Sequence, residues 1–423
     1  MVSRKPRGFS LLLAGHIVST FGSSIYVVTL VLYLAELTDS PQALGIIQFV
    51  SYLPAAVLGP VAGAAVDSWS RRRTIVWSDI VRGIVMLATA AVGLTLGRLP
   101  YWLLVGATMV VSLAGVAFVP AVHALVPDLV DARRLKRANG LRSALNQIAN
   151  MGGSALGGAL YVALGAPVLI LLNGVSFLLS GLSETAIRPR PRRPPTREPL
   201  GTRVRVGIDL LIRDHGIRAL VLVQAATNLL LPPLVVALPF AISQVWRLPA
   251  EFFGYLFAAV LAGGIAGFLI FSGARTTPLV EARLYRGALP LIAAVIATLG
   301  FLASAGAAAT PVLVPVLLLV MFLAGGAIGT MYMIGVTRIQ RSVEAGMRGR
   351  VFATLEMLTA VLLPAAYLVS GLVVEALRPR YGALFAALAA ATAALAVVVM
   401  CHREMRRVLR GDRPADRATT EAR

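Results

Sequence analysis

Charged side chains are scarce in this chain: only 14% of its 423 residues are Asp, Glu, Lys or Arg, whereas 58% are hydrophobic. A soluble domain carries about 25% charged residues, so this chain cannot cover a water-facing surface of the usual kind. Its single cysteine, Cys401, excludes an internal disulfide and a cysteine-based metal site. Long apolar runs recur along the chain instead, which is typical of a protein that crosses a bilayer repeatedly.

Sequence motifs of enzymes and of ATP-driven pumps are missing as well. The sequence contains no acid-rich prenyl-transfer motif and no Gly-x-x-x-x-Gly-Lys-Ser/Thr loop that would hold a nucleotide phosphate. A membrane-embedded transferase, the alternative from another class, would need clustered acids for a metal or a catalytic His and Asp set. We therefore expect no enzymatic activity, no cofactor and no metal site.

Apolar runs long enough to span a bilayer, roughly 20 residues each, occur twelve times. The predicted spans are residues 9–36, 43–66, 74–96, 100–126, 140–164, 167–187, 217–243, 251–272, 287–305, 312–337, 351–376 and 381–401. The basic start, residues 1–7, precedes an apolar run without a clear cleavage site, so we interpret that run as the first span and not as a signal peptide. The sequence thus predicts an all-α membrane protein.

One long polar stretch, residues 188–216, divides the spans six and six. Its prolines exclude a helix at its start, and Val204, Ile208 and Leu211 recur at the spacing of an interfacial amphipathic helix. The predicted organisation is an N-terminal six-helix bundle (1–187), a cytoplasmic linker with that short helix (188–216), a C-terminal six-helix bundle (217–401) and a basic cytoplasmic tail (402–423).

Lys and Arg fall almost entirely on one side of the predicted membrane. With the N-terminus in the cytoplasm, cytoplasmic segments contain 34 of them and outer loops four, with Arg82 inside a span. The positive-inside rule predicts this asymmetry, so the net charge of +20 reflects topology better than nucleic-acid binding. We expect a multi-pass protein of a bacterial inner membrane, monomeric, with both termini in the cytoplasm.

The two sets of six spans resemble each other weakly. At an offset of 204 residues, Gly59 matches Gly263 and Gly63 matches Gly267. At an offset of 213 residues, Arg137 matches Arg350 and Gly158 matches Gly371. Parallel repeats related by an axis along the membrane normal are typical of transporters, whose substrate site lies between the halves. We therefore expect a small-molecule substrate as the main partner besides the lipid bilayer.

The connection after the second span combines glycine, acid and arginine. Asp67 follows Gly63 at a helix end, where a carboxylate can face the N-terminus of a neighbouring helix. Arg71 and Arg72 follow in the next turn and can pair with Asp128, although Asp128 could equally be a solvated loop acid. We interpret this cluster, together with Arg350, as a cytoplasmic gate that latches when the inner side closes. 

This connection resembles the signature of the major facilitator superfamily, Gly-x-x-x-Asp-Arg-x-Gly-Arg-Arg, with Ser68 and Ser70 departing from it. Ser78-Asp79-x-x-Arg82 resembles the drug- and siderophore-exporter branch, whose members are enterobactin-exporter-like and macrolide-efflux-like. The run Gly153 to Gly158 is similar to the antiporter motif Gly-Pro-x-x-Gly-Gly, with Ser154 in place of proline. The resemblance covers residues 9–401.

The resemblance implies the major facilitator fold, with 12 transmembrane helices in two six-helix pseudo-symmetric bundles, and alternating access. It implies a secondary-active exporter of a drug-like or siderophore-like compound, with protons as a further partner in antiport. An importer or a lipid flippase on the same fold is the alternative. No arginine lies between residues 101 and 127 of the fourth span, where proton-coupled drug antiporters often carry one.

Polar side chains within spans are candidates for the substrate path, because polar groups are costly in hydrocarbon. The candidates are Asn146, Asn150, Gln224, Asn228 and Tyr332. Hydrogen bonding between helices is the structural alternative for them.

Two ionisable residues are candidates for proton coupling. Glu356 lies about five residues into its span, and His16 ionises near neutral pH when unperturbed. Structural roles are the alternative for both. Asp79 and Arg82, three residues apart on one helix, are expected to neutralise each other, and Glu184 stands at a span end.

Overall fold

The computed structural model describes residues 7–65, 69–131, 134–188, 215–273, 277–305, 311–343, 348–378 and 380–401, and all regular elements within these ranges are helical. They are α1 (Arg7–Thr38), α2 (Pro41–Ala65), α3 (Arg71–Leu96), α4 (Tyr101–Gly115), α5 (Phe118–Leu129), α6 (Leu135–Thr185), α8 (His215–Leu229), α9 (Leu231–Phe240), η2 (Ala241–Val245), α10 (Phe252–Gly273), α11 (Pro278–Ser304), α12 (Leu313–Ser342), α13 (Arg348–Ala376) and α14 (Tyr381–Cys401).

The described residues contain eleven helical runs that are long and apolar enough to cross a membrane, and one of them, Arg137–Thr185, has 49 residues. A straight helix of that length would extend for about 74 Å, more than twice the hydrocarbon thickness. Gly165 has φ 75° and ψ 165° inside this run, a conformation that glycine adopts without strain. The chain turns there, so α6 has a first arm before Gly165 and a second arm after it, and the total is the predicted twelve passes.

Two other passes are interrupted. α4 and α5 together form the fourth pass, with a short break at residues 116 and 117. The seventh pass consists of α8, α9 and the π-helical turn η2, and Pro232 and Pro233 lie at the start of α9. Membrane helices tolerate such breaks where neighbouring helices satisfy the freed backbone groups.

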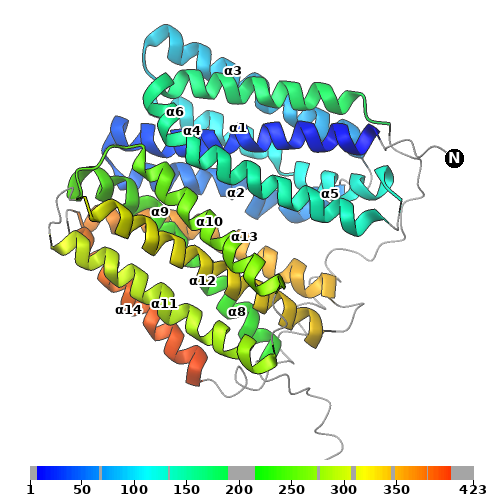
Figure 1. Ribbon diagram of the computed structural model, residues 1–423. Helices are drawn as coiled ribbons and strands as arrows, with labels where there is room; N and C mark the ends of the chain where they lie inside the picture. Colours follow the sequence, from blue (N-terminus) through cyan, green and yellow to red (C-terminus); the bar gives the residue numbers. More distant parts are fainter. Residues whose placement is uncertain are drawn as a thin grey trace, which may run out of the picture.

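Helices α1–α6 form an N-terminal half and α8–α14 a C-terminal half, which lie one above the other in Figure 1. Within the halves, α1 and α3 pack along α6, and α11 packs along α14. Two pairs of helices make the most extensive contacts between the halves, α2 with α13 and α6 with α10. These are the second pass with the eleventh and the fifth with the eighth, as the predicted repeat requires. The predicted amphipathic helix near Val204 and the basic tail lie outside the described residues.

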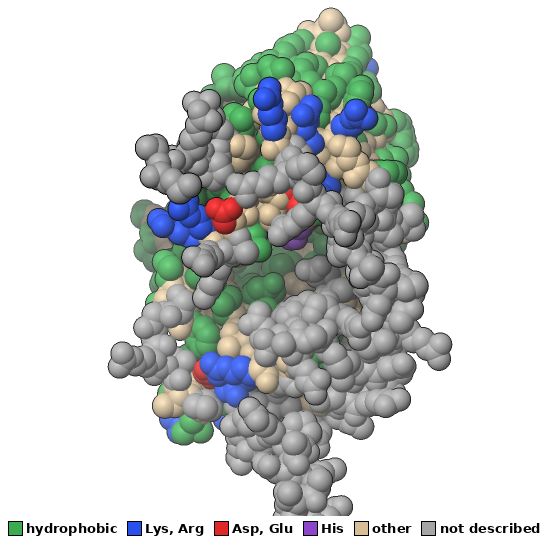
Figure 2. Space-filling model, turned by 90° about the vertical axis from the view of Figure 1, so that its right-hand side faces the viewer, with side chains coloured by type: hydrophobic (Ala, Val, Ile, Leu, Met, Phe, Trp, Pro, Cys, Tyr) green, Lys and Arg blue, Asp and Glu red, His purple; other side chains and the backbone are tan. Residues whose placement is uncertain are grey.

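The two ends of the bundle differ in charge. One end contains the start of α1 and the arginines Arg71 and Arg338, and we name it the basic end. Figure 2 looks at this end and shows Lys and Arg side chains on both halves. The described surface between the halves is recessed in this view and consists mainly of apolar side chains. The opposite, or far, end contains the connection from α1 to α2 and the connection from α13 to α14.

Glycines allow α10 and α12 to approach closely. A methyl group added to Gly263 would lie 1.9 Å from the carbonyl oxygen of Phe322, and one added to Gly325 would lie 1.9 Å from that of Val260. Gly267 also lies against α12, since a methyl group on it would lie 2.5 Å from the Gly326 carbonyl oxygen. The matching Gly59 of α2 has no atom of the described residues within 4 Å of the same position.

Candidate functional site

A charged junction closes the far end between the two halves. Arg378, after α13, donates from its two terminal nitrogens to the carboxylate and the carbonyl oxygen of Asp39, which follows α1. Gln244 donates to the other carboxylate oxygen of Asp39 at 2.8 Å, and Tyr381 donates to Gln244 at 3.2 Å. The hydrogen bonds to Asp39 raise the pKa of Arg378, so the guanidinium stays charged at physiological pH.

A second acid reinforces this junction. Glu375 on α13 accepts a hydrogen bond from the Ser40 hydroxyl at 2.8 Å and one from the backbone N–H of Gln42 at 3.3 Å. Because Gln42 lies in the first turn of α2, the carboxylate also meets the positive end of the helix dipole. The C-terminal half therefore binds the start of α2 with one acid and the end of α1 with one base.

Two glycine crossings lie next to the charged junction. A methyl group on Gly45 of α2 would lie 2.8 Å from the Gly371 Cα of α13, and one on Gly254 of α10 would lie 3.0 Å from the Gly158 nitrogen of α6. Gly158 and Gly371 are a matched pair of the predicted repeat, so the repeat places one crossing in each pair of helices that joins the halves. 

The aromatic pair Tyr52 and Tyr367 stacks one step closer to the middle of α2, with ring centres 5.2 Å apart. Every hydrogen bond, ring contact and glycine crossing that links two described residues of different halves lies between this pair and the far end. The described parts of the halves are therefore joined over the far side of the bundle.

Each ion pair that joins two described residues at the basic end lies within one half. Arg71 at the start of α3 lies 2.5 Å from Asp128 of α5, which is one of the two alternatives that the sequence left open, and Arg72 donates to the Ile187 carbonyl oxygen at 3.1 Å. In the C-terminal half, Glu281 at the start of α11 lies 2.6 Å from Arg338 of α12. The first pair joins the third and fourth passes, and the second pair joins the ninth and tenth, which are their counterparts in the repeat. The base lies on the earlier pass in the N-terminal half, and the acid lies on the earlier pass in the C-terminal half.

The other predicted gate residues are only partly described. Gly63 lies in α2 and Arg350 in α13, but their side-chain surroundings lie outside the described residues, as does Asp67 altogether. Their predicted role in a gate stays a prediction.

The predicted path residues of the N-terminal half lie on the first arm of α6 and face α1. The Asn146 amide nitrogen lies 3.0 Å from the His16 ring, and the Thr20 hydroxyl lies 3.4 Å from the Asn146 oxygen. Asn150 accepts a hydrogen bond from Ser24 at 2.7 Å. These contacts hold the two amides in fixed positions, and the amides remain partly exposed.

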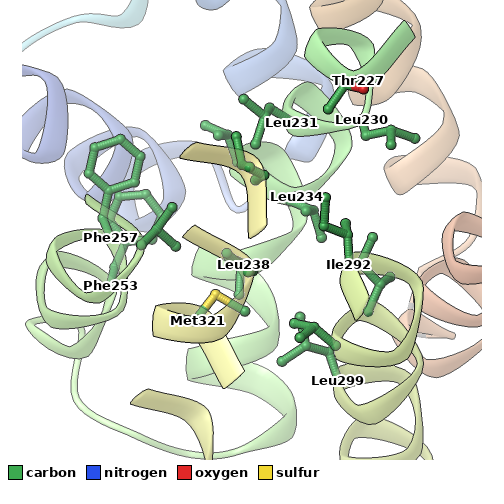
Figure 3. Close-up of a pocket in the computed structure, with 16 residues that line it drawn as sticks. Thr227, Leu230, Leu231, Leu234, Leu238, Phe253, Phe257, Ile292, Leu299 and Met321 are labelled. Carbon is green, nitrogen blue, oxygen red and sulfur yellow. The ribbon is translucent and has the colours of Figure 1, made fainter. Parts of the chain in front are cut away.

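The C-terminal half contributes an apolar cavity between α8, α9, α10, α11 and α12 (Figure 3). Leu234, Phe257 and Met321 line it, and Thr227 is the only polar side chain among the described residues that line it. Gln224 is buried one turn before Thr227, with its amide oxygen unpaired among the described residues. 

The remaining predicted path and proton residues are scattered. Asn228 is half-buried beside the cavity, and Tyr332 is 49% exposed on α12. Gly325 and Gly329, on the same helix as Tyr332, pack against α10. Glu356 lies in α13, and its side chain is outside the described residues.

Sequence reasoning missed two groups of residues. It counted Arg378 only as a loop charge and did not identify its partners on α1 and η2, although a basic residue in a nearly charge-free set of outer loops was a usable signal. It also placed Glu184 at a span end, whereas Glu184 has no exposed surface, because α1 and α3 pack over the end of α6.

The chain matches the Major Facilitator Superfamily over residues 12–361. Macrolide efflux protein A of Streptococcus pyogenes is 26% identical over 184 residues, which are 43% of this chain and 44% of that protein. The chain thus spans less than half the length of this curated relative. An uncharacterized MFS-type transporter of Mycobacterium tuberculosis is 26% identical over 396 residues, 88% of this chain and 86% of that protein.

Solved structures share the fold. A single-residue variant of the nucleoside transporter NupG has a TM-score of 0.76 and 12% identity, covering 93% of this chain and 98% of that one. A bacterial homologue of the iron transporter ferroportin in its inward-facing state has a TM-score of 0.70 and 18% identity over the same shares. With its twelve passes, its two joined halves and the family match over most of its length, this chain belongs to the Major Facilitator Superfamily of transporters.

Proposed function

We propose that the chain is a secondary-active transporter that exports an amphipathic, drug-like small molecule by alternating access. The observation that carries the proposal is the junction at the far end, where the Asp39–Arg378 pair and the glycine crossings hold the halves together. The similarity to macrolide efflux protein A supports export of a large, partly apolar compound.

The basic end faces the cytoplasm in this proposal, because the Lys and Arg excess lies there and the positive-inside rule orients it. Both termini are then cytoplasmic and the protein resides in a bacterial inner membrane as a monomer. In this proposal the structure, with its far end closed, represents the inward-facing state, in which a compound enters from the cytoplasm. Residues 1–187 and 217–401 act as the two moving bundles, linked by 188–216.

The two halves offer different chemistry to a substrate. The N-terminal half presents the amides of Asn146 and Asn150 next to His16, and the C-terminal half presents the apolar cavity of Figure 3. Pockets for small molecules typically combine an apolar lining with a few placed polar groups. A compound with hydrogen-bonding groups on one side and an apolar arm on the other fits both surfaces. 

Closure of the cytoplasmic side completes the proposed cycle. Gly63, Asp67, Arg71, Arg72, Asp128 and Arg350 form its gate in this proposal. Arg71 and Asp128 are already paired within the N-terminal half, so the gate closes by bringing two preassembled surfaces together and does not require that pair to break.

Expression in an efflux-deficient host tests this function with a panel of antibiotics and dyes. We expect resistance to rise about tenfold for large amphipathic compounds such as macrolides and to stay unchanged for small, highly charged ones. Accumulation of a fluorescent member of the panel, with and without an uncoupler, then reports direction and coupling. Increased accumulation in the expressing cells would indicate an importer, and an unchanged panel with altered leaflet distribution of labelled lipid would indicate a flippase.

Replacement Asn228→Ala is expected to change substrate preference. If the Asn228 amide binds a polar group of the substrate, its loss costs about 1 kcal/mol, or roughly a fivefold rise in KM for that compound. Compounds without a polar group there should keep their KM. Asn139→Ala, at an exposed position of α6, is the matched control. Equal kinetics of the two variants across the whole panel would remove Asn228 from the path.

A further inference from the structure

The N-terminal half buries two carboxyl groups and one guanidinium between α3 and the second arm of α6. Asp79 and Glu184 have no exposed surface, and the side chain of Arg82 is 12% exposed. Arg82 lies 2.7 Å from Asp79, and the charged groups that face Glu184 are Asp79 and Arg82. Neither oxygen of Glu184 has a hydrogen-bond partner among the described residues.

Close packing leaves little room around these groups. A methyl group on Gly181 would lie 3.3 Å from the Asp79 Cβ, so α3 and α6 are in contact at the acid itself. From α1, a methyl group on Gly15 would lie 2.6 Å from the Ser183 hydroxyl and 3.0 Å from that of Ser180. Three helices therefore enclose the acids, and bulk water does not screen them.

The single guanidinium is fixed in place. Arg82 donates to the carbonyl oxygen of Ser78 at 3.1 Å and to its hydroxyl at 2.9 Å. Its central carbon lies 4.4 Å from the ring centre of Phe118 and 4.7 Å from that of Phe177. A desolvated cation between two aromatic rings gains further from cation–π attraction. Arg82 is thus committed to Asp79, and Glu184 has no counter-ion of its own among the described residues.

The charge balance requires one proton. If both acids were ionised, the cluster would carry one uncompensated negative charge out of water, at a cost of several kcal/mol. Two carboxyl groups that share one cation ionise one after the other, not together. We propose that Asp79 and Glu184 hold one exchangeable proton, carried by Glu184 in this state, and that this is the site through which protons drive export. This inference rests on the proposed function for its second part only.

Other ionisable groups surround the cluster without pairing with Glu184 among the described residues. From α1, His16 contacts the same Phe118 ring, with ring centres 5.6 Å apart. From α5, His123 lies 3.1 Å from Arg142 of α6, and Asp128 pairs with Arg71. These groups can adjust the field at the cluster, but the proton that balances it is held by the two acids.

Contacts of Arg82 connect the cluster to the substrate path. Ser78, which Arg82 binds, donates from its hydroxyl to the carbonyl oxygen of Ala114 at the end of α4. Phe118, on which Arg82 stacks, begins α5 and also touches His16, the partner of Asn146. When Glu184 releases its proton to the water at the basic end, a second carboxylate competes for Arg82. Movement of Arg82 would then be transmitted through Ser78 to the end of α4 and through Phe118 to the start of α5, on the two sides of the break in the fourth pass.

Infrared titration of the purified, full-length protein tests proton binding without any substrate. We expect a protonated-carboxyl band that is lost as the pH is raised, and we expect Glu184→Gln to remove it. Glu36→Gln is the matched control, since Glu36 is a carboxyl on α1 bound to Tyr161 at 2.5 Å at the far end. If Glu184→Gln does not fold, Glu184→Asp should shift the midpoint of the band. An unchanged band in the Glu184 variants would overturn the proposal.

Transport by reconstituted vesicles tests the coupling. With a labelled macrolide as probe, Glu184→Gln should abolish accumulation driven by a pH gradient while keeping exchange of labelled for unlabelled compound. Gradient-driven accumulation equal to that of the parent would overturn the coupling role. If instead the parent itself transports no compound of the panel but the titrating band is lost in Glu184→Gln, the proton site stands and the proposed export function fails.

Discussion

Replacement of Gly371 by leucine is expected to reduce transport by about tenfold or more while the protein still reaches the membrane. A side chain at this position would begin 3.0 Å from the Gly45 Cα and from the Pro41 carbonyl oxygen of α2. Both of these atoms belong to backbone and cannot rotate away. Overpacking of this kind costs about 1–3 kcal/mol, and the cost applies only when the far end is closed. The variant should therefore favour the state in which the far end is open.

Accessibility from outside the cell distinguishes this cause from general damage. Cys401 is the only cysteine in the chain, so Cys401→Ser provides a background for a single reporter, Gln48→Cys, at a buried position of α2. We expect a membrane-impermeant maleimide to label this reporter in Gly371→Leu and not in the parent. Gly287→Leu is the control, since Gly287 has open space around it. Unimpaired transport by Gly371→Leu would show that the crossing does not close during the cycle.

Replacement of Gly263 by alanine is expected to destabilise the protein strongly, although alanine is the smallest possible change. The added methyl group would lie 1.9 Å from the Phe322 carbonyl oxygen, so α10 and α12 must separate by more than an ångström. The loss of packing in such a case is about 1–3 kcal/mol. Thermal unfolding in detergent should therefore occur several degrees lower than in the parent.

The neighbouring glycine, Gly264, provides a control whose replacement by alanine should not lower the melting temperature. A methyl group on Gly264 would lie 3.6 Å from the Gly325 carbonyl oxygen, an ordinary contact. Alanine is about 1 kcal/mol more favourable than glycine inside a helix, so Gly264→Ala should leave the melting temperature unchanged or raise it. Equal melting temperatures for the two variants would contradict the close approach of α10 and α12.

The helices and their orientation could be predicted from the sequence because hydrophobic length and charge asymmetry act over twenty residues at a time. The twelve predicted passes are confirmed, including the two that the turn at Gly165 joins into one run. The repeat also carried spatial information, since Gly158 and Gly371 both lie at crossings between the halves. Helix ends were less predictable, because single capping and turn residues set them.

The candidate site was less predictable, for a physical reason. Contacts such as Arg378 with Asp39 join residues more than 300 positions apart, and neither residue forms a local motif. Burial at a span end was equally hidden: the sequence around Glu184 is polar enough for an interface, and only the packing of α1 and α3 removes it from water. By contrast, Asp79 with Arg82 was predicted because the pair is local, and Arg71 with Asp128, which joins two helix ends, was one of two alternatives left open.

The reversal at Gly165 leaves no slack between the two arms of α6. The first arm carries Gly158, in backbone contact with α10, and the second arm ends next to Glu184. A displacement that starts where the halves meet can thus pass from the first arm of α6 to the second across the turn at Gly165. Separation of the halves on one side of the membrane and the change in protonation of Glu184 near the other side are then mechanically coupled through α6.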